Sequence, residues 1–511
     1  MAYEQYLTLF NTSENKIINR SYKDCVFKIE WTDADILADL VGVGVDPASV
    51  KYHLKIILGY GAEVAILKSP TGYFHIEQVL QDYTETDSQG YAALFGSILM
   101  PQSTSGGTLY SNSPFAIHKL DKYSCNKNNL IQVYFEVGLS FYNEEQSTFY
   151  PAEFRRPKGN NLFSRYYFWN AVQQHNTINP FVDGIRDITE YYPYILDQTS
   201  KRFLTNQSPD FKRKVRVKDY HTLAFFNGRF CDSSNQGHGH HNSPCSTSTV
   251  KWIYCRLYNQ AGGTISTGRV ENTEANGGTY LPTLNSPNLE INNILPWNKG
   301  LLYVGVGPQN IINSWEDTGG GLMQSADFSN ASRYEIWAAG PGGSGDRHSQ
   351  FYNFEMQEED CKGYETIRLA YLNRQGAWDY MNFTKKSTRT FDITRSNFKQ
   401  NYGIVPIKYS GSTNPSYNKW DYNSAMGGTK TYNVNSIETI EANSDWLTEE
   451  DAVHLEELFT SPDVYMYESN SEFVPVVVTE RDYTKQTKAN DKLIQYVISI
   501  QKGHELRIQR L

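Results

Sequence analysis

The stretch of the chain richest in metal-binding side chains runs from Cys231 to Cys245 and reads CDSSNQGHGHHNSPC. Between the two cysteines it holds His238, His240 and His241. Thiolate and imidazole are usual ligands of zinc, which takes four ligands in a tetrahedron braced by outer contacts. The loop is therefore a candidate site for a metal ion. A disulfide between Cys231 and Cys245, and a flexible surface loop without metal, are the alternatives.

Familiar catalytic motifs are absent from the rest of the sequence. It contains neither a G-x-S-x-G nucleophile elbow nor an H-E-x-x-H metal helix, which excludes the serine hydrolases and zinc proteases that use them. Glycoside hydrolases use two carboxylates brought together from distant strands, which leaves no local signature. Asp379 lies between Trp378 and Tyr380, rings that could stack on sugars, so a polysaccharide depolymerase stays an alternative. We predict no catalytic residue and no cofactor other than the candidate metal ion.

The composition predicts a mainly β protein. The chain has 511 residues, among them 37 Tyr, 25 Phe, 9 Trp and 37 Gly, while only 20% are charged. Aromatic residues suit pleated, half-buried surfaces, and Gly and Asn suit the turns between strands. At roughly 150 residues per domain, this length also predicts several domains. The expected fold is a multi-domain, β-sandwich-like architecture with one short helix near the C-terminus.

The charge balance argues against nucleic acid as a partner. The net charge is -9 and the pI about 5.7, whereas phosphate contacts need clustered Lys and Arg. The one dense basic run, Lys212 to Lys218, alternates with valines and predicts a strand with one solvated face. A local contact with a phosphate or a lipid headgroup is its alternative. The first residues do not resemble a signal peptide, and no run reaches the roughly 20 apolar residues that span a bilayer, so we expect a soluble protein.

The first predicted domain covers residues 1–158. Its border is placed at the segment with Pro151 and Pro157, because proline disfavours continuing a strand ladder. Interrupted period-two patterns between Gly, Asn and Ser turns indicate a β domain. The strands are expected at Tyr52 to Leu58, Gly72 to Gln78 and Leu130 to Phe141.

Two further domains are predicted, at residues 159–345 and 346–511. The aromatic run Leu162 to Trp169 is expected to open the central domain, a β-sandwich-like unit with long loops. The border to the last domain follows Ala338 to Asp346, where four glycines in nine residues favour a linker.

The last domain is expected to combine a hairpin, one helix and closing strands. Ile367 to Leu372 and Ala377 to Phe383 predict two strands joined by the turn Asn373 to Gly376. Residues 449–459 predict a helix with Thr448 as its N-cap and acidic residues in the first turn. The closing strands are expected at Val464 to Tyr467, Phe473 to Thr479 and Leu493 to Gln501.

Four segments of this last domain carry a resemblance to a known class of proteins. They read RLAYLNRQGAWDYMNF from Arg368, TRTFD from Thr388, DWLTEEDAVHLEELFTSPDVYMY from Asp445 and FVPVVVTERDYTKQT from Phe473. The stretch 365–511 resembles the C-terminal region of virion tail and baseplate proteins of tailed bacteriophages, in particular phages of marine and gut Bacteroidota. In that resemblance the helix and the V-P-V-x-V-T strand are structural, which implies no catalytic residue.

The resemblance implies a structural, non-enzymatic subunit of a phage virion, made in the host cytoplasm and placed in the baseplate, tail tip or collar. Tyr and Trp are enriched at the contacts of such assemblies, so we expect self-association in a symmetric ring and contacts with other tail proteins. Trp378 and Tyr380, with the helix 449–459, are the expected interaction elements for internal docking, and the loop 231–245 is expected to be free to touch a neighbour. A receptor- or carbohydrate-binding tail-fibre module is the first alternative, and a depolymerase the second. The absence of coiled-coil heptads and long β-helix repeats weighs against both.

Overall fold

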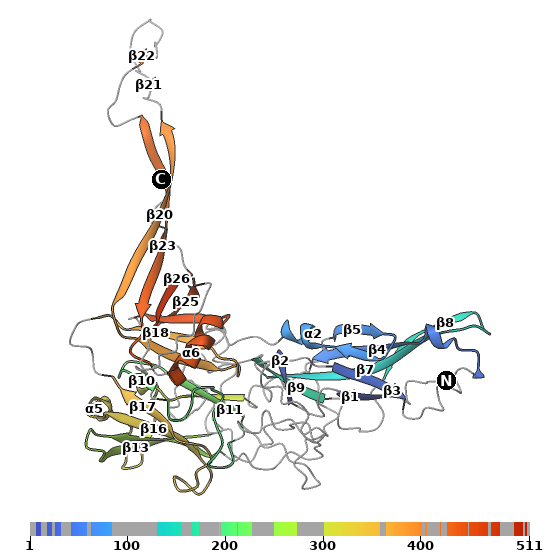
Figure 1. The fold of residues 1–511 in the computed structure, drawn as a ribbon, viewed down its shortest axis with the longest axis horizontal. Coiled ribbons are helices and arrows are strands. Elements are labelled where there is room, and N and C mark those ends of the chain that lie inside the picture. The colour runs from blue at the N-terminus through green and yellow to red at the C-terminus, as the bar shows by residue number, and fades with distance from the viewer. Residues whose placement is uncertain are drawn as a thin grey trace, which may run out of the picture. The chain divides into compact units, whose positions relative to one another are not determined.

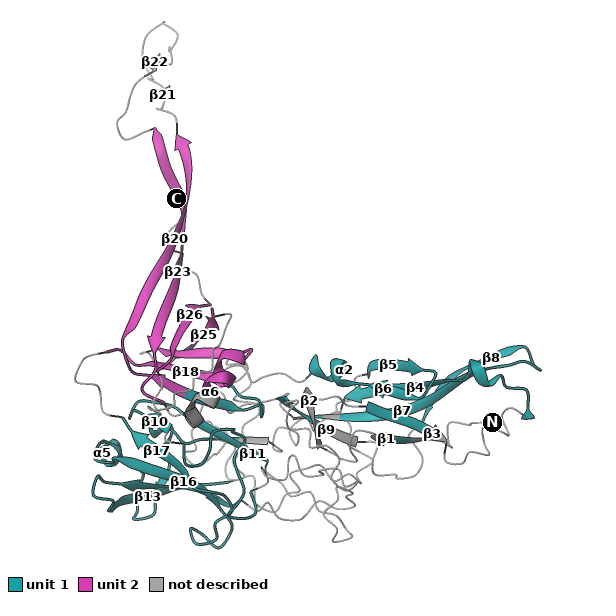
Figure 2. Ribbon diagram, viewed as in Figure 1, with its two compact units in different colours: residues 1–359, 372–380 teal, residues 360–371, 381–511 magenta. Residues whose placement is uncertain are grey.

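The structure is a computed structural model of the chain and is mainly β, with several antiparallel sheets and few helices, as predicted. The chain packs as two compact units, Met1–Glu359 with Leu372–Tyr380, and Asp360–Tyr371 with Met381–Leu511 (Figure 2). The three-domain division stays a prediction. No helix in the described part is long and apolar enough to cross a membrane. The structure describes residues 7–11, 18–22, 26–31, 42–58, 63–83, 130–155, 165–172, 194, 196–211, 213–226, 250–272, 301–357, 364–400, 404–405, 419–420, 427–447, 449–468, 472–480, 495–503 and 506–507.

The first unit contains a sandwich of two sheets built from its N-terminal part (Figure 1). Leu54 and Ile56 alternate with less buried residues along β4, and their face meets Phe27 of β3, whose ring centroid lies 4.6 Å from that of Phe135 in β7. Burying each such side chain stabilises the fold by roughly 1.5–3 kcal/mol. The larger sheet has the order β2 (Ile18–Tyr22), β9 (Arg165–Val172), β7 (Leu130–Asn143), β4 (Lys51–Leu58) and β5 (Glu63–Ser69), with β8 (Thr148–Arg155) on β7. The smaller sheet has the order β1 (Leu7–Asn11), β3 (Val26–Trp31) and β6 (Tyr73–His75). The same region contains two short helices, η2 (Pro47–Ser49) and α2 (Glu77–Gln81).

The predicted strands of this region are confirmed as β4 and β7 and in part as β6, because Glu77 and Gln78, expected in that strand, begin the helix α2. Two further details differ from expectation. Pro151 lies inside β8 and does not end it. β8 is an edge strand that pairs with β7 alone, and the β7–β8 register shifts between Leu139 and Phe141 of β7, opposite the part of β8 that holds Pro151. Proline is tolerated at such a position because its missing N–H breaks no ladder bond. The aromatic run expected to open the central domain forms β9, which pairs with β7 and β2 and so belongs to the first sheet.

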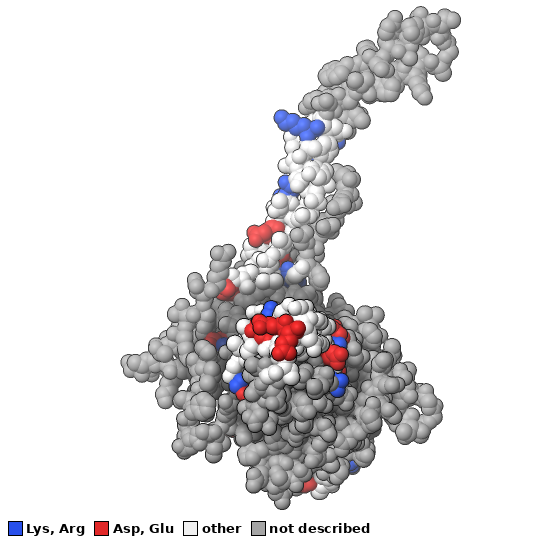
Figure 3. Space-filling model, turned by 90° about the vertical axis from the view of Figure 1, so that its right-hand side faces the viewer, with Lys and Arg blue, Asp and Glu red and all other residues white. Residues whose placement is uncertain are grey.

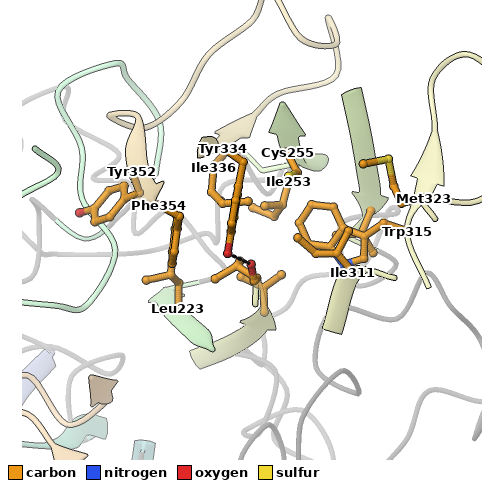
Figure 4. Close-up of a cluster of buried hydrophobic side chains, with 14 of the residues drawn as sticks. Leu223, Ile253, Cys255, Ile311, Trp315, Met323, Tyr334, Ile336, Tyr352 and Phe354 are labelled. Atoms are coloured by element: carbon orange, nitrogen blue, oxygen red, sulfur yellow. Dashed lines mark hydrogen bonds between the residues drawn. The ribbon is translucent and has the colours of Figure 1, made fainter. Parts of the chain in front are cut away.

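A second sandwich forms the central part of the first unit. Its core joins Leu223 of β11 to Ile253 of β12 and to Tyr334 of β16, whose hydroxyl donates to the Val306 carbonyl at 3.0 Å (Figure 4). One sheet has the order β10 (Arg213–Val215), β17 (Tyr352–Met356), β16 (Arg333–Ala339), β12 (Trp252–Tyr258), β13 (Thr264–Glu271) and β15 (Glu316–Asp317); the other pairs β11 (Thr222–Phe226) with β14 (Leu301–Gly305), and α4 (Pro308–Ile311) and α5 (Ser325–Ser329) are short helices.

The Gly-rich segment expected to be a linker is a closed loop between neighbouring strands of one sheet. β16 ends at Ala339, and after the loop the chain returns as β17, which pairs antiparallel with β16. The Gly340 amide donates to the Asp346 carbonyl at 2.8 Å, and the Gly342 amide donates to the Asp346 carboxylate at 3.1 Å. The glycines therefore serve a compact turn within a sheet, which local composition does not distinguish from a linker.

The basic run forms a strand, as predicted, and residues on one face of it are buried. Its strand β10 is short, and Arg213 is buried within it beside Val215. The guanidinium donates to the backbone carbonyls of Gln207 and Ser208 at 3.0 and 3.1 Å and lies 4.8 Å from the ring centroid of Tyr352. Arg213 is thus an interior residue, because backbone carbonyls and an aromatic face replace its water.

The second unit is built on most of an eight-stranded sheet with α6 (Glu449–Thr460) packed against it, while the hairpin turn and the first residues of β19 in that sheet group with the first unit. The predicted hairpin is confirmed, and its turn closes with the Gly376 amide donating to the Asn373 carbonyl at 3.0 Å. The predicted helix is confirmed as α6 (Glu449–Thr460), with Leu455 and Leu458 in the core. The sheet order is β19 (Trp378–Phe383), β18 (Ile367–Leu372), β24 (Val464–Glu468), β25 (Glu472–Val478), β26 (Val497–Lys502), β23 (Gly428–Asn443) and β20 (Ser387–Gln400), with β27 (Leu506–Arg507) also on β23, and β21 (Ile404–Val405) pairs with β22 (Lys419–Trp420).

Candidate interaction surfaces

The two predicted interaction residues, Trp378 and Tyr380, lie in the interior. Their side chains are only 2% and 3% exposed. The Tyr380 hydroxyl is 2.8 Å from the Thr222 hydroxyl, and its ring centroid lies 4.4 Å from that of His221. These contacts are made within one chain, so the residues presented to another molecule are different ones.

Asp379, between these two rings, is closed off on both carboxylate oxygens. The Thr205 hydroxyl donates to Oδ1 at 2.6 Å, and Nδ2 of Asn373 donates to Oδ2 at 2.9 Å. Burial raises the pKa of Asp379 to about 6, against the lowering effect of both hydrogen bonds and of the charge on Arg213. The carboxyl ties the hairpin turn to the segment at Thr205, and in this conformation its oxygens are occupied and out of reach of a sugar.

The candidate metal loop, with His238, His240 and His241, lies outside the described residues. Among the residues that the structure does describe, no group of three or more His, Cys, Asp or Glu side chains is placed to hold a metal ion. The metal ion stays a prediction from the sequence.

One face of the central sheet carries aromatic rings that are covered by cations of the same chain. The Trp252 ring has the Arg269 guanidinium 4.4 Å from its centroid, and the Arg256 guanidinium lies 5.0 Å from the Trp337 ring, which stacks on Tyr254. Cations over aromatic faces stabilise a sheet surface and occupy the faces on which a sugar would stack. These rings therefore serve the sheet and leave no open stacking platform at Trp252 and Trp337.

The long hairpin of β20 and β23, which we name the arm, is the most exposed part of the described structure of the second unit. The two strands pair antiparallel from Ser387 opposite Ala442 to Gln400 opposite Gly428. β26 and β27 contact β23 over Thr439–Asn443 and at Asn435 and Ser436. The arm therefore runs on beyond the other strands of its sheet (Figure 1), with β20 as the one strand beside β23 in the described part near Gly428.

Large apolar side chains of the arm face solvent. Phe391 is 50% exposed, Ile393 46%, Phe398 40% and Tyr432 51%. The Phe398 and Tyr432 rings meet edge-on with centroids 6.2 Å apart, at the bulge where the register shifts. A two-stranded hairpin is at best marginally stable in water, and exposed aromatic residues in a row mark contact surfaces.

Charged residues divide the arm into a basic outer part and a base with a salt-bridge network. We name residues 393–400 and 428–436 the outer arm; it holds Arg395, Lys399 and Lys430 and no Asp or Glu. Lys and Arg side chains are visible along the arm in Figure 3. At the base, Glu438 accepts from Arg389 at 2.5 Å and from Lys502 at 2.8 Å.

The turn between β7 and β8 forms a second exposed surface, in the first unit. Phe149 is 60% exposed, and Tyr142 and Tyr150 are each 38% exposed. Glu144 and Glu145 occupy the turn, and acidic side chains gather on this end of the molecule in Figure 3. We name residues 142–150 the acidic hairpin end; it contains no Lys or Arg.

Sequence reasoning missed the arm, although a signal for it is present. Only Thr388 to Asp392 was singled out, as part of the resemblance. Apolar residues at alternating positions, Phe391 with Ile393 and Tyr432 with Val434, are typical of a half-polar strand. The length of the arm depends on pairing between strands that lie far apart in the sequence, which local patterns do not show.

Comparisons with known proteins identify no family. No family model matches the chain, and no curated protein matches it. A Salmonella alpha-2-macroglobulin variant gives a TM-score of 0.15 at 6% identity, covering 98% of this chain and 34% of that one. The native conformation of the E. coli alpha-2-macroglobulin gives 0.14 at 7% identity, covering 99% and 34%. The chain spans about a third of the length of these proteins. Such scores carry no argument about fold or function.

Proposed function

We propose that this chain is a structural subunit of a tailed-phage virion, in the baseplate, tail tip or collar. Copies of the chain form a symmetric ring that docks other tail proteins. Its work is assembly, with no bond made or broken, and it resides in the virion after synthesis in the host cytoplasm.

The arm is the observation that carries this proposal. In the described part of the sheet β20 is the last strand, and its 14 residues contain no proline that would block a further contact. Natural proteins protect or cover such an edge, because an open edge pairs with other chains. An arm that exposes aromatic residues along a two-stranded hairpin fits a chain whose partner arrives on assembly.

The sequence supplies the specific assignment to a virion. The stretch 365–511 resembles tail and baseplate proteins, and the arm lies within that stretch. The many Tyr and Trp residues fit a protein of repeated contacts, because these side chains are enriched where protein surfaces meet.

The test is quantitative mass spectrometry of purified virions from a phage that carries this gene. We expect the chain at a fixed copy number per particle that is a multiple of three or six, as a closed ring requires. Light scattering on the isolated chain should show an oligomer whose size follows the same symmetry. A chain that is absent from particles and monomeric in solution would overturn the proposal.

A further inference from the structure

The outer arm has the features of a ligand for an acidic, aromatic surface. Ile393, Arg395 and Lys399 follow each other at intervals of two and four residues along β20, which places them on one face of the strand. Apolar surface and positive charge therefore lie on the same side. By the same alternation Phe398 lies on the other face of the strand, with Lys430 directly opposite it in the register and the Tyr432 ring beside it, so that face too carries exposed rings next to a positive charge.

The acidic hairpin end has the complementary features. Its turn presents Glu144 and Glu145, and the Asp46 amide donates to the Tyr142 carbonyl at 3.1 Å, which places a third acidic residue beside the hairpin. Phe149 and Tyr150 are exposed on the strand that follows. The surface thus offers negative charge and aromatic rings together.

We infer that the outer arm of one copy docks on the acidic hairpin end of a second copy. This inference rests on the proposed function and names the contact that builds the ring. Opposite charges on the two surfaces steer the encounter and fix the pairing, while the exposed rings supply the apolar area to be buried. The contact joins two different surfaces of the same chain head to tail, and such a contact builds a ring when the rotation between neighbouring copies closes.

Pairing of one arm with another fits the charges less well. Arg395, Lys399 and Lys430 of both copies would then approach each other with no acidic residue on either outer arm. Like charges brought together disfavour a contact. Strand addition to the edge of β8 is disfavoured too, because Pro151 lacks the backbone N–H that a ladder needs. The contact is therefore one of side chains on the hairpin end.

Charge reversal on each surface tests the inference in the full chain. The arm pair is Arg395→Glu with Lys399→Glu, and the hairpin pair is Glu144→Lys with Glu145→Lys. A control pair, Arg202→Glu with Lys218→Glu, makes the same change in net charge as the arm pair at exposed positions outside both surfaces. Assembly is read by light scattering on the isolated protein and by incorporation into virions, and circular dichroism checks the fold.

We expect each reversed pair to abolish the oligomer at a concentration where the parent chain is fully assembled, and the control pair to leave it intact. A chain with both reversed pairs should assemble again, because the charges are complementary once more. Raising the salt from about 0.1 M, where the Debye length is about 10 Å, should weaken the parent assembly.

The outcomes separate the contact from the function. An assembled parent chain that is indifferent to the hairpin pair overturns the inference and leaves the proposed function standing. Loss of assembly with the arm pair alone points to an arm–arm contact or another protein as the occupant, and equally overturns it. A parent chain absent from particles overturns the proposed function itself.

Discussion

The central core of the first unit and the arm of the second use the same kinds of side chain in opposite ways. Tyr334 and Phe354 stack with centroids 4.7 Å apart and are almost completely buried. Phe391 and Ile393 are about equally apolar and lie in a strand of similar regularity, yet each is close to half exposed. Side-chain chemistry alone therefore does not decide which residues hold the fold and which meet a partner.

The number of neighbouring layers makes the difference. β16 has β12 on one side and β17 on the other, and the pair β11 and β14 supplies side chains to the same core. β20 has β23 on one side, and its residues are exposed along almost the whole strand. The core is complete within one chain, whereas the described residues leave the apolar side chains of the arm largely exposed.

Buried carboxylates show the same contrast through their pKa values. Asp379 sits among neutral donors, so burial dominates and raises its pKa. At Glu438 burial also acts to raise the pKa, but hydrogen bonds from Lys502 and Arg389 and their charges outweigh it, and the pKa falls below its ordinary value. One carboxyl favours its protonated form in the folded state and the other its ionised form.

Truncating a ring in the core should give the largest effect. Phe354→Ala removes the ring that stacks on Tyr334 and contacts His221 edge-on at 5.0 Å between centroids. Loss of a buried Phe leaves a cavity, so we expect the free energy of unfolding to fall by about 3–5 kcal/mol. Urea denaturation of the full chain measures it, with Phe149→Ala as the exposed control. A loss below about 1 kcal/mol would mean that the core does not depend on this stack.

The pH dependence of stability at Asp379 should be the next largest. The folded-state pKa of about 6 lies above the value of 3.8 for an exposed carboxyl, so the folded state binds the proton more tightly. The contribution of Asp379 to the free energy of unfolding is therefore fully present below about pH 4. It is lost as the pH rises through 6, by about 3 kcal/mol in all.

Asp379→Asn should remove this dependence, because an amide is neutral at every pH and can donate to the Thr205 hydroxyl while accepting from Asn373. Urea midpoints at several pH values between 4 and 7 measure it. A variant that keeps the slope of the parent protein would assign the titration to another group.

The sequence was sufficient for the elements whose signals are local. The helix at α6 followed from its apolar stripe and acidic first turn, and the hairpin of β18 and β19 from two strand patterns around the turn that ends at Gly376. The positive φ of Gly376 explains why a glycine stands there. Partners distant in sequence were not predictable, since nothing near Asp379 shows that Thr205 will meet it.

Exposure was the least predictable property. Trp378 and Tyr380 were expected as interaction residues for internal docking, and their pattern did not show that both rings would be almost completely enclosed. The strand pattern of the basic run did not show that Arg213 would be buried, which depends on backbone carbonyls of Gln207 and Ser208 that accept hydrogen bonds from its guanidinium. Burial depends on which layers cover a strand, and that is decided by long-range packing and not by the residue itself.

At the base of the arm, Glu438 should make a smaller contribution to stability whose pH dependence is opposite to that of Asp379. Glu438→Gln keeps the size and shape of the side chain but removes the charge that pairs with Arg389 and Lys502, which are both partly exposed to water. We expect a loss of about 1 kcal/mol, because solvent screens this network. In the parent protein the contribution is present at neutral pH and is lost as the pH falls below the ordinary Glu value. Denaturation of the second unit at pH 7 and pH 4 should show the variant closer to the parent at pH 4, and an equal gap at both would contradict the assignment.

The smallest effect on folding should come from the arm itself, and it sharpens the comparison with the core. Phe391→Ala removes the same ring as Phe354→Ala, but from a side chain that is 50% exposed. We expect a change of at most about 0.5 kcal/mol in the unfolding free energy of the free chain. Phe391 lies two residues before Ile393, on the same face of β20 as Arg395 and Lys399, so the proposed contact beside it should weaken and assembly should be reduced. Calorimetry and light scattering on the same preparation measure the two. If Phe391→Ala lowered the unfolding free energy as much as Phe354→Ala, the arm would be covered within its own chain. Removing a ring destabilises the monomer only when that ring is already packed in the monomer.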